Sequence, residues 1–112
     1  MASGLRAYGA ASAGRSGRER EADVFRRANG ALRAARTAGR TDQVRALADN
    51  RRLWSAVLGL VFDPASPLPA PLRGAIASVG LAVQREVERE TPNLDFLIAV
   101  NENIASGLAG ES

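Results

Sequence analysis

The sequence predicts an all-α protein, a small bundle of about four amphipathic helices with a disordered N-terminal arm. Apolar residues recur at helical 3-4 spacing in four segments. Stretches that contain Gly or Pro separate these segments. Only five of the 112 residues are aromatic, so the core must consist mainly of Ala, Leu, Val and Ile, which suits helices packed on helices. The length indicates one domain.

The first part of the chain contains the arm and one helix. Residues 1–17 are mostly Gly, Ala and Ser, so we expect a flexible arm there and a single helical domain over residues 18–112. A first helix is predicted from about Arg18 to Arg36, and Gly39 is a plausible end signal. The residues on its apolar face are Phe25, Ala28, Leu32 and Ala35.

The second helix, predicted over residues 42–62 with Thr41 as its N-cap, is apolar on two sides. One stripe contains Val44, Leu47, Trp54, Leu58 and Val61. The opposite face carries Leu53, Val57 and Leu60. A helix that is apolar nearly all round is either central in the fold or covered by something else. The second face therefore predicts contact with a protein partner, a second copy of the chain, or another element of the bundle.

Two further helices follow proline-containing breaks. The loop over residues 63–70 cannot continue a helix, and Pro71 suits the first position of the next one. That helix is predicted over residues 71–89, with a buried stripe of Leu72, Ile76, Val79, Val83 and Val87. A fourth helix is predicted over residues 93–108, with an apolar face of Leu94, Leu97, Ile98, Ile104, Ala105 and Leu108.

Two asparagines stand out because they lie among apolar residues. Asn101 interrupts the apolar face of the fourth helix, and Asn50 precedes Trp54 by one helical turn. A buried amide must find hydrogen-bond partners, since an unpaired one is costly. Two interpretations remain equally open: an amide that fixes the register of the bundle, or an amide that faces a partner helix.

The composition excludes several classes of function. The chain has no Cys and no His, so disulfides, thiol nucleophiles and the commonest metal ligand are absent. No apolar run approaches the ~20 residues of a membrane span. The N-terminus also lacks the apolar segment of a secretory signal, which predicts a cytoplasmic protein. We expect no cofactor, no metal and no enzymatic activity.

The charge distribution is polarised along the chain. Residues 1–52 hold twelve arginines against five acidic residues, whereas residues 53–112 hold three arginines against seven. A possible basic face along one side of the first helix comprises Arg26, Arg33, Arg36 and Arg40. Such a face could bind RNA phosphates, but no aromatic residue is interleaved for base stacking. A solvated face is therefore the favoured interpretation, and a nucleic-acid partner is the alternative.

Several short motifs occur in a fixed order along the chain. They are Ala7-Tyr8, RExEA at Arg18–Ala22, NRRLW at Asn50–Trp54, Leu68-Pro69, and NENIASGL at Asn101–Leu108. In this order, the motifs closely resemble the FlaF family of bacterial flagellar biosynthesis regulators. The resemblance covers almost the whole chain, and NRRLW and the NxNIAxGL ending are its most specific parts.

The resemblance implies a cytoplasmic role in the synthesis or export of flagellin, alongside a second regulator, FlbT. Members of the family look like flagellin secretion chaperones, so flagellin is the expected partner, an FlbT-like regulator a second one, and a homodimer a further possibility. Together with the apolar second face, the motifs suggest partner-binding residues, which are Asn50, Leu53, Trp54, Val57, Leu60, Asn101, Asn103 and Ile104.

Overall fold

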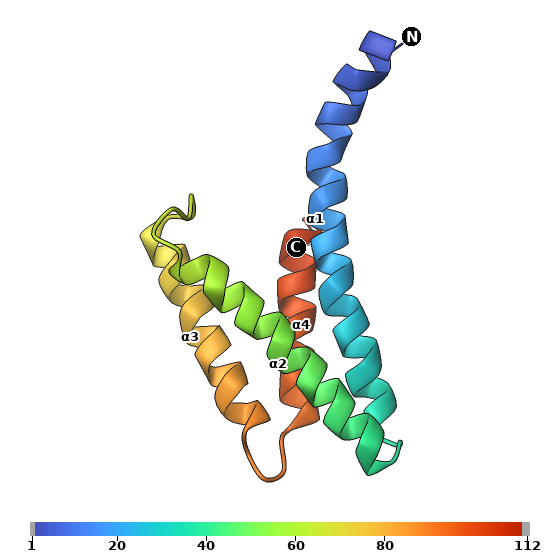
Figure 1. The fold of residues 1–112 in the computed structure, drawn as a ribbon, viewed down its shortest axis with the longest axis vertical. Helices are drawn as coiled ribbons and strands as arrows, with labels where there is room; N and C mark the ends of the chain where they lie inside the picture. Colours follow the sequence, from blue (N-terminus) through green and yellow to red (C-terminus); the bar gives the residue numbers. More distant parts are fainter. Residues whose placement is uncertain (1, 111–112) are drawn as a thin grey trace.

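The structure is a computed structural model, which describes the backbone of residues 2–110 and the side chains of residues 17–110. It contains four helices: α1 (Ala2–Ala35), α2 (Arg40–Phe62), α3 (Ala70–Val87) and α4 (Leu94–Leu108) (Figure 1). No strand occurs within residues 2–110. The prediction of an all-α bundle of four helices is confirmed.

The helix ends differ in detail from the predicted ones. Residue Gly39, in an extended conformation, is the N-cap of α2, so the prediction of Thr41 as the cap is wrong, and Thr41 lies in the first turn. Helix α3 begins one residue before Pro71, which still falls in the first turn. The side chain of Asn93 caps α4, because its Oδ1 accepts a hydrogen bond from the Phe96 backbone N–H at 3.1 Å.

The largest difference in bounds is at the start of α1, which begins at Ala2 rather than near Arg18. The side chains of residues 1–16 lie outside the described part of the chain. The backbone of residues 2–17 belongs to α1 in the structure. The flexible arm predicted for residues 1–17 and the single domain over residues 18–112 stay predictions.

The four helices form two pairs. Helix α4 lies along α1, and α3 lies along α2, while contact between α1 and α2 joins the pairs (Figure 1). Helices α3 and α4 are joined at one end by a short loop and meet in only a few places. The bundle is consequently open along its α3–α4 edge.

A buried core lies where the pairs meet. The core contains Ala22, Phe25, Leu32, Ala35, Ala46, Trp54, Val83, Val87, Leu97, Ile98 and Ala105. The predicted stripe of α3 is only partly in it. Whereas Val83 and Val87 are buried, Leu72 is 45% exposed and Val79 is 36% exposed. The prediction that the whole stripe is buried is wrong, because α4 contacts α3 in only a few places and does not cover the N-terminal half of this stripe.

Candidate functional site

Three of the predicted partner-binding residues form a hydrogen-bonded network inside the bundle. The side chains of Asn50, Trp54 and Asn101 have no exposed surface. The Trp54 indole N–H donates to Asn101 Oδ1 at 2.9 Å, and Asn101 Nδ2 donates to Asn50 Oδ1 at 2.7 Å. These side chains therefore join α2 to α4 and are closed to a partner in this conformation. For Asn101, the register-fixing interpretation is the one that agrees with the geometry.

A third buried asparagine, Asn29, lies in the same part of the core, and the sequence analysis missed it. Its Nδ2 donates to the Ile98 backbone oxygen at 3.0 Å and so joins α1 to α4. The signal was available, because Asn29 lies between Phe25 and Leu32 at helical spacing. A polar residue at such a position must be paired when it is buried.

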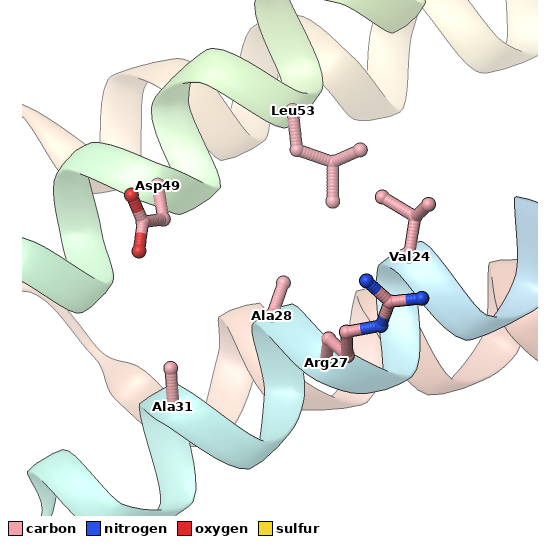
Figure 2. A pocket seen from close by; sticks show the side chains of 6 residues that line it. All are labelled: Val24, Arg27, Ala28, Ala31, Asp49 and Leu53. Carbon is pink, nitrogen blue, oxygen red and sulfur yellow. The ribbon is translucent and has the colours of Figure 1, made fainter.

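The predicted second face of α2 lies beside α1. Residues Leu53 and Val57 are half-buried, while Leu60 is 71% exposed. Leu53 and Val24 point toward one another across a shallow hollow of about 240 Å³ between α1 and α2 (Figure 2). A second hollow, of about 320 Å³, shares Ala31 and Asp49 with the first. Together they form a shallow groove between α1 and α2.

The outer part of the α2–α3 hairpin, residues 53–84, is almost uncharged. Between residues 53 and 84, the sequence contains only Asp63 and Arg73 as charged residues. Leu81 is exposed on the side of α3 opposite Leu72. The other large apolar side chains exposed along this hairpin are Leu60, Phe62, Leu72 and Val79. Exposed apolar surface of this kind commonly marks a site of protein–protein contact.

The remaining two predicted residues are on α4. Residue Asn103 is exposed and Ile104 is half-buried. They lie on the flank of the helix that faces away from α1, since α1 contacts α4 through Asp95, Ile98 and Glu102. The structure thus divides the predicted site into a buried network, a face of α2 and a flank of α4.

The predicted basic face is largely engaged within the bundle. The Arg33 guanidinium binds the Glu102 carboxylate at 2.6 Å, and Arg36 pairs with Asp95. Arg26 pairs with Asp23 on its own helix at 3.4 Å. Arg40 is the first residue of α2 and not a part of the first helix, so the proposed single face on that helix is wrong in this respect.

The electrostatics of Glu102 reflect this pairing. The hydrogen bond from Arg33 lowers the pKa of the Glu102 carboxyl below its usual 4.5, and a hydrogen bond from Asn29 lowers it further. The ion pair Arg33–Glu102 is half exposed, and Asp95 in the pair with Arg36 is 77% exposed. Both pairs therefore orient α1 against α4 more than they stabilise the fold.

Other kinds of site were also sought. No cluster of three or more side chains suited to a metal ion occurs in the part of the chain that the structure describes. Within the same part, no helix is long and apolar enough to cross a membrane.

The fold and its surfaces define a small helical protein whose core is held by buried amides and whose outer hairpin is apolar. Residues 5–108 match the family model described as flagellar protein FlaF, and the chain belongs to this family. The chain is thus a flagellar protein, and the resemblance found in its motifs is confirmed. None of the curated proteins and none of the solved structures compared with the chain matches it.

Proposed function

We propose that this chain is a cytoplasmic flagellin-binding secretion chaperone that supports the synthesis and export of flagellin. The observation that carries the proposal is the nearly uncharged outer part of the α2–α3 hairpin, residues 53–84, which exposes Leu60, Phe62 and Leu72 to solvent. Side chains of this size favour burial, since burying one contributes roughly 1.5–3 kcal/mol.

The chemistry of flagellin fits this surface. A flagellin monomer has amphipathic helical ends that must not polymerise in the cytoplasm. A small helical bundle can mask such a helix by binding its apolar face. An FlbT-like regulator would be a second partner, through which the supply of flagellin is linked to its synthesis.

Complex formation is the direct test. The full chain, alone and with flagellin monomer, is analysed by size-exclusion chromatography with light scattering, and a stable one-to-one complex is expected. The variant Leu60→Asp/Leu72→Asp, which places one charge on each helix of the hairpin, should lose the complex. The control is Val44→Asp, because Val44 is 57% exposed and lies at the far end of α2. If flagellin never co-elutes with the unchanged chain at physiological salt, the proposal fails.

The alternative, an RNA-binding regulator of flagellin translation, receives less support. Phosphate binding needs arginines that are available to the ligand, yet Arg33 and Arg36 already pair with carboxylates of α4. RNA binding would be strongly dependent on salt, whereas an apolar protein contact would not. A filter-binding titration against flagellin messenger RNA at two salt concentrations distinguishes the two functions.

A further inference from the structure

The open edge between α3 and α4 has the character of an unfilled helix position. Helix α3 is fastened to α2 and not to α4. An added Cβ at Gly80 would lie 2.6 Å from Leu58 Cδ2, which shows how closely the two helices approach. Lower on the same face, Gln84 Nε2 donates to Ser55 Oγ at 2.9 Å. These contacts hold α3 against α2, so the edge cannot close by a swing of α3 alone.

Helix α4 is fastened to the other pair. Its residues Ile98 and Glu102 bind Asn29 and Arg33 of α1. By helical spacing, Val100 and Ile104 then lie on the remaining flank, toward α3. Both side chains are half-buried.

The two helices present matching apolar stripes at this edge. On α3, Leu72, Ile76 and Val79 continue upward from buried Val83 at the spacing of one helical face. On α4, Val100 and Ile104 continue upward from buried Leu97. Val83 and Leu97 belong to one buried core cluster. The two helices converge toward the α3–α4 loop and diverge above it (Figure 1). The open edge is therefore an extension of the core itself.

Neither stripe carries a charge. Arg73 shares its helical face with Gly80 and Gln84, which contact α2. Asp95 and Glu102 of α4 are bound to α1. An occupant of the edge would therefore desolvate no charged side chain of this protein, and it must itself present an uncharged apolar face.

We infer that the α3–α4 edge binds one amphipathic helix of the client, which packs between Leu72, Ile76 and Val79 on one side and Val100 and Ile104 on the other, as a fifth helix of the bundle. The stretch from Leu72 to Val83 is about 16 Å long, which suits a client helix of about three turns. The inference rests on the proposed function, because flagellin supplies the client helix.

A client helix fits this edge better than a second copy of the chain. A stable dimer of standard size uses roughly 20–30 residues on each side. The edge offers a few half-exposed apolar side chains over about three turns. That surface suits a single helix, which supplies the missing neighbour to both α3 and α4.

The test uses two exposed leucines of α3 as a matched pair. Leu72 and Leu81 are each 45% exposed, and nine residues of a helix place them on opposite sides. Binding of flagellin monomer to the full chain is measured by titration calorimetry. We expect Leu72→Asp and Val79→Asp to weaken binding about tenfold or more, because each buries a charge against the client helix. The control Leu81→Asp tests the opposite side of α3, and Val44→Asp, at the exposed far end of α2, should bind like the unchanged chain.

Three outcomes overturn the inference. The first is equal binding by Leu72→Asp and Leu81→Asp. The second is loss of binding in Leu60→Asp while Leu72→Asp and Val79→Asp still bind. That result would place the client on α2, away from the α3–α4 edge, and would leave the proposed function standing. The third is a dimer of the chain alone that Leu72→Asp converts to a monomer. Absence of flagellin binding by the unchanged chain would instead remove the proposed function. The milder Val79→Thr, which keeps the side-chain shape, covers the case in which an aspartate variant does not fold.

Discussion

The indole of Trp54 on α2 donates its N–H to the side-chain oxygen of Asn101 on α4, with 2.9 Å between the two heavy atoms and no exposure of either side chain. The amide of Asn101 in turn donates to Asn50. One side chain of α4 therefore satisfies a donor and an acceptor of α2 in the centre of the bundle. Because buried polar groups are costly to leave unpaired, this relationship fixes how the two helices align.

We predict that Asn101→Leu destabilises the fold by about 2–4 kcal/mol, because it leaves the Trp54 N–H and Asn50 Oδ1 without a partner. The free energy of unfolding is measured by urea titration, followed by circular dichroism. The control is Asn103→Leu, since Asn103 is exposed on the same helix. It should change stability by less than about 0.5 kcal/mol. Similar losses in both variants would show that the buried network does not hold α4.

Much of the fold follows from the sequence because its signals are local. Helical spacing identified four helices, and the breaks at Gly39, Pro64 and Pro92 fall between them. Two of the three buried asparagines were identified beforehand, since each lies beside obvious apolar residues. The pairing of the helices was not accessible in this way, because it depends on contacts between residues far apart in the chain.

Gly80 gives a prediction about the contact between α2 and α3. A Cβ at this position would lie 2.6 Å from Leu58 Cδ2 and 3.2 Å from Trp54 Cε3, whereas one at Gly74 would meet nothing within 4 Å. Both Gly80→Ala and Gly74→Ala gain about 1 kcal/mol of helix propensity. Only Gly80→Ala also overpacks the contact with α2, which destabilises the fold by about 1–3 kcal/mol. We therefore expect thermal unfolding to show Gly74→Ala as the more stable variant by about that difference. Equal stability of the two variants would mean that α3 packs less closely against α2 at Gly80 than it does in the structure.

The candidate site was less predictable than the fold, and the arginines explain why. From the sequence alone, Arg33 and Arg36 belong to a basic face on the first helix. Their partners, Glu102 and Asp95, are about 60 to 70 residues away and become neighbours only when α4 packs on α1. Likewise, the exposure of Leu72 depends on the position of α4, and periodicity alone assigns it to the core.

The ion pair of Glu102 predicts how stability depends on pH. Arg33 lowers the pKa of this carboxyl in the folded chain below the usual 4.5. A group with a lowered folded pKa stabilises the fold above its unfolded pKa, and the contribution is lost as the pH falls through the folded pKa. We expect Glu102→Gln to unfold at a lower temperature than the unchanged chain at neutral pH, with the difference shrinking as the pH falls below ~4.

The control for this series is Glu90→Gln, because Glu90 is exposed and forms no ion pair in the part of the chain that the structure describes. Melting curves of the three proteins are compared at several pH values. A difference between Glu102→Gln and the unchanged chain that persists undiminished in acid would contradict the role assigned to the Arg33 pair.

The last prediction concerns Asn29 and Asn50, which we expect to be neighbours because each lies one helical turn from a pair of contacting rings. The rings of Phe25 and Trp54 are in edge-to-face contact, with their centroids 5.8 Å apart. One turn further toward the α1–α2 link, α1 carries Asn29 and α2 carries Asn50. Asn29 Oδ1 and Asn50 Nδ2 are buried and have no hydrogen-bond partner among the described residues. One is an acceptor and the other a donor, so they are complementary.

We therefore expect Asn29 and Asn50 to be coupled in a double-mutant cycle of Asn29→Leu, Asn50→Leu and the double variant. If the two amides are neighbours as expected, each single change leaves the other amide against an apolar side chain, whereas the double change removes both polar groups together. The double variant should lose less free energy of unfolding than the two single variants lose together, by about 0.5–3 kcal/mol in urea titrations. Strict additivity would show that the two amides act separately, Asn29 on α4 alone and Asn50 through Asn101 alone.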